Sequence, residues 1–222
     1  DLPELLNTIS EIPHKFFIRV GMMNPMYMPR IRDGLLKSFE STKVFKFLHI
    51  PVQSGSDKVL NDMKRGHTVQ TFRDVTDHFR DKFEKFTIST DVIVGFPTET
   101  EDDFKQTLRL IEQTRPDIVN LSRYSRRPGT DAAEMKQIDV SEIKRRSKIA
   151  YELITKISNE NNRKWVDWEG HVIFDEGYEG QVRGRNFAYK PIFIKEKPKI
   201  GQILNVKIIN ATKHSLVGKI IS

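Results

Sequence analysis

The chain has 222 residues, of which 37% are hydrophobic and 30% charged, with no cysteine and a formal net charge of +7. This apolar content is enough to build a buried core, which excludes a wholly disordered chain. The lack of cysteine excludes disulfides, thiolate zinc sites and cysteine-ligated iron–sulfur clusters within this chain. No apolar run approaches the roughly 20 residues of a membrane span, so we expect a cytoplasmic protein. The positive charge favours an anionic partner.

The first part of the chain alternates predicted strands with predicted helices. The expected strands are Phe16–Gly21, Val44–Val52, Phe86–Val94 and Asp117–Tyr124. The expected helices end near Glu11 and Met63, or span Ile31–Phe39, Val69–Phe83, Thr100–Thr114 and Ser141–Asn162. Strands and helices that alternate at this spacing are typical of parallel βαβ units.

After Trp165 the pattern changes to short β-rich runs separated by glycines. The expected strands are His171–Phe174, Gln181–Arg185, Ile192–Ile194, Ile203–Ile209 and Leu216–Ile221. Short strands packed this closely predict a small all-β barrel of the oligonucleotide-binding type. The predicted domains are therefore residues 1–164 and residues 165–222.

One face of each strand in the first domain carries polar side chains. These side chains include Arg19, His49, Gln53, Asp91 and Asn120. A parallel strand covered by helices on both faces is normally apolar throughout. The bias predicts a curved sheet or barrel that binds a ligand at the carboxyl ends of its strands. The alternative is that these polar groups satisfy one another and bind water.

Three segments are specific enough to suggest a family. They are residues 49–57 (HIPVQSGSD), 89–104 (STDVIVGFPTETEDDF) and 124–133 (YSRRPGTDAA). In this order they resemble the radical S-adenosylmethionine (radical SAM) methylthiotransferases. Residues 19–25 (RVGMMNP) resemble the archaeal and eukaryotic branch, whose members convert N6-threonylcarbamoyladenosine beside the tRNA anticodon to its 2-methylthio derivative. The last part of the chain resembles that family's TRAM domain.

The resemblance implies the C-terminal half of a radical SAM β/α barrel, followed by an RNA-binding TRAM barrel. Full-length members are transferases that use S-adenosylmethionine (SAM) and two 4Fe–4S clusters, one of them bound by a CxxxCxxC loop. Because this chain has no cysteine, we expect it to be a fragment that retains neither cofactor and is inactive alone. The expected partner is the tRNA anticodon stem–loop.

The resemblance also implies a cofactor site. Gln53 and Ser54 match the end of a strand that faces the ribose and methionine of SAM, although Ser54 equally suits a helix N-cap. The segment from Asp91 to Gly95 matches a strand that lies along the adenine, where glycine permits close approach. Asn120 continues the polar row, and we assign it to the same site.

Two lumen residues have competing interpretations. Arg19 suits the carboxylate of SAM or of the substrate, since guanidinium binds carboxylate in a bidentate way. An ion pair between Arg19 and Asp91 is equally compatible with the pattern. His49 is more typical of a satisfied core residue than of a proton donor.

Seven residues are candidates for RNA contacts. They are Arg123, Arg126, Arg127, Arg183, Arg185, Tyr189 and Lys190. In the second domain, cations interleaved with aromatic rings are typical of surfaces that bind single-stranded RNA. Solvated arginines and a solvated hairpin are the alternatives. Trp165 and Trp168 are expected to pack the domain junction.

Other functions remain open at this point. One is an RNA-binding module without catalysis, and another is methylthiolation of a ribosomal protein. A half barrel also leaves a strand edge unpaired, which predicts a dimer or a domain swap through that edge.

Overall fold

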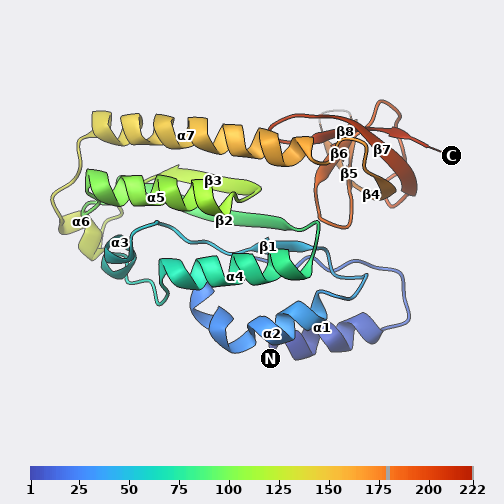
Figure 1. The fold of residues 1–222 in the computed structure, drawn as a ribbon, viewed down its shortest axis with the longest axis horizontal. Helices are drawn as coiled ribbons and strands as arrows, with labels where there is room; N and C mark the ends of the chain where they lie inside the picture. The colour runs from blue at the N-terminus through green and yellow to red at the C-terminus, as the bar shows by residue number, and fades with distance from the viewer. Residues whose placement is uncertain (179–180, 222) are drawn as a thin grey trace.

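The computed structural model describes residues 1–178 and 181–221. Figure 1 shows an α/β part joined by one long helix to a small β-barrel. The helical elements are α1 (Leu2–Glu11), η1 (Pro25–Tyr27), α2 (Met28–Ser38), α3 (Asp57–Asp62), α4 (Val69–Lys82), α5 (Glu101–Thr114), α6 (Asp131–Glu134) and α7 (Val140–Arg163). The strands are β1 (Phe47–His49), β2 (Thr87–Val94), β3 (Ile118–Arg123), β4 (Glu169–Tyr178), β5 (Gln181–Arg185), β6 (Pro191–Phe193), β7 (Ile203–Ala211) and β8 (Leu216–Ile220).

The α/β part is built on a parallel sheet of strand order β1-β2-β3. Phe47 of β1 lies opposite Thr87 of β2, and Asp91 of β2 lies opposite Asn120 of β3. Parallel neighbours need a crossover connection, which α4 and α5 provide. The predicted βαβ arrangement is confirmed, and it places the carboxyl ends of all three strands at one edge.

The core of the α/β part lies between one face of the sheet and the helices. Leu48, Ile88 and Val92 from the strands are fully buried in one cluster with Phe72 of α4 and Phe104 of α5. The other face carries the polar row that alternation predicts, because successive side chains of a strand point to opposite sides. The sheet therefore has a helix-covered apolar face and a mixed face turned toward the open half of a barrel.

Two predicted strands differ from the structure. Phe16–Gly21 is not a buried strand: it forms only isolated bridges, such as Ile18 with Val44, and Phe17 and Arg19 are exposed. No neighbouring strand in the described chain covers its outer edge. The Val44–Val52 strand is regular only over β1, because the Val52 N–H donates to Thr90 Oγ1 instead of continuing the ladder.

The second part is a closed barrel of strand order β4-β5-β6-β8-β7, as the sequence predicts. Trp165 packs into its core with Phe174, Ile192 and Leu216. The indole of Trp165 also contacts Trp168 edge-on at 5.7 Å and lies under the Lys85 ammonium of the first part. Trp165 thus packs the junction, as expected. In the described ranges of the chain, none of the helices has the length and apolarity to cross a membrane.

Candidate functional site

A cavity of about 560 Å³ lies where the three parallel strands end. Its wall includes Gln53 just after β1, Asp91 of β2, and Asn120 of β3. These three residues were predicted to converge on one space, and the structure brings them together. The volume is within the usual range of sites for small organic ligands, about 300–1,000 Å³.

Asp91 is the centre of the polar row in this cavity. Its Oδ1 accepts a hydrogen bond from Asn120 Nδ2 at 2.7 Å and lies 3.0 Å from His49 Nε2. Among the residues that the structure describes, Oδ2 of Asp91 has no partner, and the side chain is 23% exposed. The carboxylate is held in a fixed orientation with one oxygen left as an acceptor. This contact satisfies the His49 ring, as expected. The partner of Asp91 is therefore His49, and the alternative ion pair between Asp91 and Arg19 does not form.

Gln53 takes a left-handed backbone conformation with φ of 71°. Its N–H donates to the Asp91 carbonyl at 2.8 Å, and its carbonyl accepts from the Ile93 N–H at 2.9 Å. These two bonds hold a conformation that costs a non-glycine residue about 1–2 kcal/mol. Strain of this kind gathers at functional sites, and here Gln53 lines the cavity together with Asp91.

An aromatic pair forms another wall of the cavity. Tyr124 lies edge-on to Phe96 with ring centroids 5.5 Å apart. The hydroxyl of Tyr124 is buried and, within the described residues, has no hydrogen-bond partner. A buried polar group without a partner is costly, so this hydroxyl is available to a ligand. The sequence pattern gives Tyr124 as the end of a predicted strand and assigns it no role in the site.

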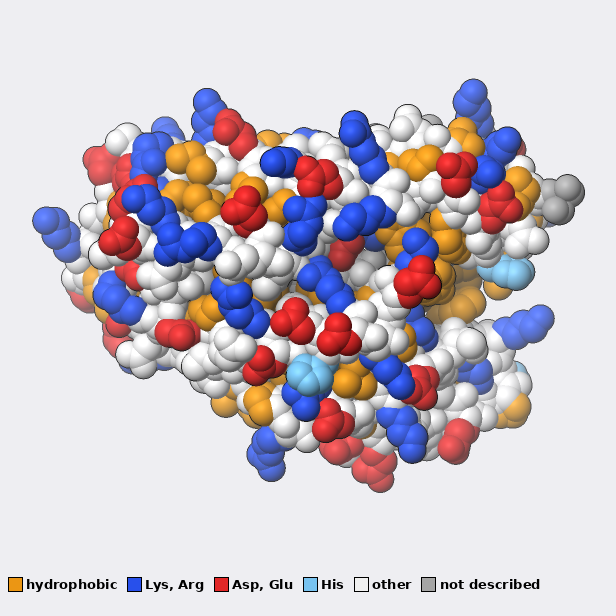
Figure 2. All heavy atoms as spheres, in the orientation of Figure 1, with side chains coloured by type: hydrophobic (Ala, Val, Ile, Leu, Met, Phe, Trp, Pro, Cys, Tyr) orange, Lys and Arg blue, Asp and Glu red, His pale blue; other side chains and the backbone are white. Residues whose placement is uncertain are grey.

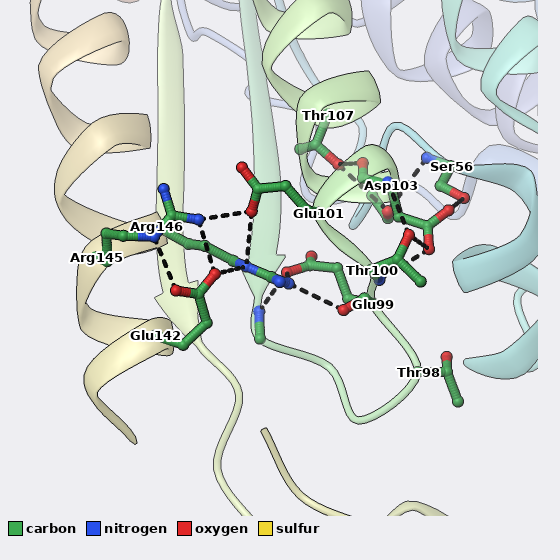
Figure 3. A network of polar contacts seen from close by, with 12 residues as sticks. Ser56, Thr98, Glu99, Thr100, Glu101, Asp103, Thr107, Glu142, Arg145 and Arg146 are labelled. Carbon is green, nitrogen blue, oxygen red and sulfur yellow. Dashed lines mark hydrogen bonds and ion pairs between the residues drawn. The ribbon is translucent and has the colours of Figure 1, made fainter. Parts of the chain in front are cut away.

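The loop after β2 is fixed to α7 by a buried ion pair (Figure 3). Arg146 Nη1 contacts Glu99 Oε1 at 2.6 Å and donates to the Glu99 carbonyl at 2.9 Å. The Oε1 atom of Glu99 also accepts a hydrogen bond from the Gly95 N–H at 3.0 Å. Burial raises the pKa of Glu99, while the bonds from Arg146 oppose that rise. Sequence reasoning missed this pair, although Arg146 stands out as a cation on the buried stripe of α7.

Ser54 and Gly95 do not line the cavity. Ser54 is fully buried, and its Oγ accepts from the Ser56 N–H and lies 3.4 Å from Thr107 Oγ1. Gly95 has φ of 81°, and a Cβ there would lie 2.6 Å from Ile143 Cγ1 of α7. The close approach that requires glycine is therefore made to a helix. Ser56 is the N-cap of α3, the role considered for Ser54.

A second group of hydrogen bonds fixes the start of α5, also visible in Figure 3. Asp103 Oδ1 accepts from Ser56 Oγ at 2.6 Å, and Oδ2 accepts from the Thr100 N–H and hydroxyl. Burial alone would raise the pKa of Asp103, but these bonds outweigh it and lower the pKa to about 2. The carboxylate is thus held charged in the first turn of α5, where it contacts Ser56.

Two arginines, one at the end of β3 and one in the loop that follows it, lie at the rim of the cavity. Arg123 and Arg127 are exposed and line it, whereas Arg126 points to Glu134 at 3.7 Å. Exposed guanidinium groups beside a polar cavity suit a polyanionic substrate. The RNA interpretation of Arg123 and Arg127 stays a prediction.

The predicted RNA residues of the barrel lie elsewhere. Lys190 is buried, and its ammonium contacts Asp117 Oδ1 at 2.8 Å and Asn162 Oδ1 at 3.1 Å. The ring of Tyr189 packs against Phe45 at 4.9 Å, in the junction between the two parts. Arg185 is 4.3 Å from that ring. Its guanidinium is not exposed to solvent, and burial lowers its pKa.

The two remaining predicted residues also have internal contacts. Arg183 forms an ion pair with Glu176. Arg19 lies over the rings of Phe47 at 5.8 Å and Tyr189 at 5.5 Å. Arg19 is therefore at the barrel side of the sheet, away from the cavity.

The cavity chemistry fits a nucleoside cofactor. A free carboxylate oxygen and two amides can bind ribose hydroxyls, and the Phe96–Tyr124 wall offers ring surface to a base. The residues do not fit an iron–sulfur cluster, because the chain has no cysteine. In the described part of the chain, no group of three metal-binding side chains is found either.

Comparison with known proteins agrees with this geometry. Residues 1–111, half of the chain, match the Radical SAM superfamily, and residues 173–221 match the TRAM domain. Coproporphyrinogen III oxidase from Escherichia coli, a radical SAM enzyme, has the same fold, with a TM-score of 0.53 at 15% identity over 100% of this chain and 56% of that one.

Closer relatives carry a more specific name. A probable threonylcarbamoyladenosine tRNA methylthiotransferase of Archaeoglobus fulgidus is 44% identical over 99% of this chain, which covers 51% of that protein. The threonylcarbamoyladenosine tRNA methylthiotransferase of Xenopus laevis is 36% identical over 99% of this chain, which covers 40% of it. The chain therefore spans about half the length of the relatives it matches. With half of its residues matched by the superfamily and its last strands by TRAM, the chain belongs to the radical SAM superfamily.

Proposed function

We propose that this chain is part of a tRNA methylthiotransferase that modifies C2 of N6-threonylcarbamoyladenosine beside the anticodon. The observation that carries the proposal is the similarity, at 36–44% identity and nearly full coverage of the chain, to proteins named for that reaction. The site agrees, because it combines a nucleoside-sized cavity with a cationic rim.

Within this proposal, SAM would supply a methyl group and, on one-electron reduction by a cluster, a 5′-deoxyadenosyl radical. The residues of this chain would bind and orient SAM. Asp91 and Asn120 hold ribose hydroxyls, and Gln53 donates its amide to the same nucleoside. Tyr124 and Phe96, which contact each other edge-on, would line one side of the base and keep water from that side. The iron–sulfur clusters require cysteines, which would come from outside this chain, because the chain itself has none.

We further propose that the TRAM part, residues 165–222, holds the tRNA while residues 1–164 hold the reacting nucleoside. Arg123 and Arg127 contact phosphates that enter the cavity. A tRNA substrate also assigns the protein to the cytoplasm. The unpaired edge beside residues 16–22 is the place where a second chain or a further strand would add.

The test uses the complete gene product that contains this chain. We expect its upstream region to carry a CxxxCxxC loop. Expression in a host that lacks the 2-methylthio nucleoside should restore it, as measured by mass spectrometry of tRNA digests. Variant Asp91→Ala should abolish the product while Asp102→Ala, on the exposed side of α5, should not. Methylthiolation of a ribosomal protein without any change in tRNA would contradict the proposal.

A further inference from the structure

Three hollows follow one another along the edge formed by β3 and α7. The first is the cavity described above, which Arg123 lines. The second, about 330 Å³, lies between Arg123, Lys144 and Lys148. The third, also about 330 Å³, reaches Lys213 of the TRAM barrel. Arg123 borders the first two and Tyr151 the last two. The three hollows are therefore neighbours along one edge, and together they are here named the β3–α7 groove.

The groove side of α7 is set by helical spacing. Lys144, Lys148, Tyr151 and Thr155 are four, three and four residues apart, which places them on one stripe. The core stripe, which includes Ala150, is on another side of the helix. Along the axis, the groove stripe covers roughly 17 Å at 1.5 Å per residue.

The cations of the groove are not neutralised by carboxylates. In the part of the chain that the structure describes, no ion pair involves Arg123, Lys144, Lys148 or Lys213. By contrast, Arg145 on another side of α7 pairs with Glu101 at 2.6 Å. Figure 2 likewise shows Lys and Arg interleaved with Asp and Glu over the helices in that view.

An aromatic side chain stands in the middle of these cations. Tyr151 is 48% exposed. Its hydroxyl accepts a hydrogen bond from Lys213 Nζ at 2.5 Å, which helps lower the pKa of Tyr151. The same ammonium lies 5.1 Å from the ring centroid. This contact joins α7 to the turn before β8, so the groove continues onto the barrel.

We propose that the β3–α7 groove binds the sugar–phosphate backbone of RNA between the TRAM barrel and the cavity. This inference rests on the proposed function for the assumption that RNA is the partner. Unpaired cations spaced along a groove match a polyanion with regular charges. An exposed ring beside them suits an unstacked base better than an acidic peptide, which offers no π-face. The groove also ends at the cavity, where one nucleoside of the same strand would enter.

The experiment measures binding of this chain to a synthetic anticodon stem–loop RNA by fluorescence anisotropy, at salt from about 50 to 200 mM. Replacing both lysines, Lys144→Gln with Lys148→Gln, should weaken binding about tenfold and flatten the slope of log Kd against log salt by about 2. Lys156→Gln is the matched control, because Lys156 is an exposed lysine of α7 away from the groove stripe. It should leave Kd and slope unchanged.

A second pair of variants tests the ring. Tyr151→Ala should weaken RNA binding by fivefold or more, while Tyr151→Phe should retain it, since a ring and not a hydroxyl stacks on a base. Thermal melting of each variant checks that the fold is intact. Equal losses in both variants would contradict stacking.

If the double lysine variant binds RNA with wild-type affinity and salt slope, the proposal that the groove binds RNA is wrong. The proposed reaction would still stand if the complete protein methylthiolates tRNA. Failure of the unaltered chain to bind the stem–loop would overturn the groove as well. Loss of binding to polyglutamate, with RNA binding unchanged, would assign the groove to an acidic protein and contradict the proposal.

Discussion

The two ends of the half barrel use similar residues for different purposes. At the amino ends of the strands, the turn before β6 closes the sheet: the Lys46 N–H donates to the Phe187 carbonyl at 2.7 Å, and Tyr189 packs on Phe45. At the carboxyl ends, Asp91 and Tyr124 keep polar atoms without partners in the described chain. Cations and rings at the first end stabilise a junction, whereas polar groups at the second remain available to a ligand.

The difference shows what decides whether cations and aromatic rings are buried inside the molecule or stay exposed to a partner. Lys190 meets the buried carboxylate of Asp117, and Tyr189 meets two phenylalanines, so both are used inside the molecule. Lys144 and Lys148 have no acidic partner among described residues and stay exposed. Composition alone does not distinguish a buried, paired lysine from an exposed one, because the carboxylate that pairs with the buried lysine is distant in sequence.

The amino ends of the strands are called the closed end below, and the carboxyl ends the open end. The largest effect is expected at the closed end. Lys190→Met removes one partner of a buried pair whose side chains are 3% and 9% exposed. Asp117 would lose its ammonium partner and keep the hydrogen bond from the Ile88 N–H. The loss should lower the free energy of unfolding by about 3–5 kcal/mol, measured by urea denaturation. Lys195→Met, an exposed lysine of the same barrel, should cost almost nothing. Equal costs would mean that the junction does not depend on this pair.

The next effect concerns the loop at the open end. Gly95→Ala places a methyl group against Ile143 at 2.6 Å and in a left-handed conformation, which should cost about 2–4 kcal/mol. Gly129→Ala has a similar φ of 79° but no atom within 4 Å, so only the conformational strain should remain. Thermal unfolding of the two variants isolates the contact with α7. A Gly129→Ala cost as large as that of Gly95→Ala would show that strain alone explains both.

A smaller effect depends on pH. Asp103 has a folded pKa of about 2, below its ordinary value. Its stabilisation is therefore complete above about pH 4 and is lost as pH falls from about 4 to about 2. Asp103→Asn should unfold with about 2 kcal/mol less free energy at neutral pH, and the difference should shrink across that window. Asp102→Asn, at an exposed neighbouring carboxylate, is the control and should change the free energy of unfolding little at neutral pH.

The smallest effect is expected at Arg19. Arg19→Gln removes the cation over Phe47 and Tyr189, a contact of about 0.5–1 kcal/mol at an exposed site. A melting curve that shifts only slightly would agree with this position at the closed end. A loss as large as that of Lys190→Met would mean that burial does not separate the effects of these two cations at the closed end.

Much of the fold follows from local patterns. Alternation along residues 86–94 predicts β2 and its polar face, and the predicted helix start at Thr100 coincides with the N-cap of α5. Convergence of Gln53, Asp91 and Asn120 also follows, because parallel strands end at one edge. The resemblance of the motifs supplied the family.

Other features depend on contacts that local pattern does not contain. Ser54 and Gly95 belong to the packing of α5 and α7 on the loops, and those helices lie some 40–50 residues further along the chain. Arg146 and Glu99 are likewise joined across 47 residues. The position of Lys190 could be foreseen only by knowing that Asp117 is opposite to it.

The long helix has a consequence for how a substrate would be chosen. α7 comprises 24 residues, about 36 Å at 1.5 Å per residue, and Trp165 anchors its end in the barrel without a flexible linker. If the chain binds RNA as proposed, the length of α7 would set the distance between the barrel and the cavity. A nucleotide would be selected by how far it lies from the place where the RNA is gripped, and adding one helical turn should shift the choice along the strand.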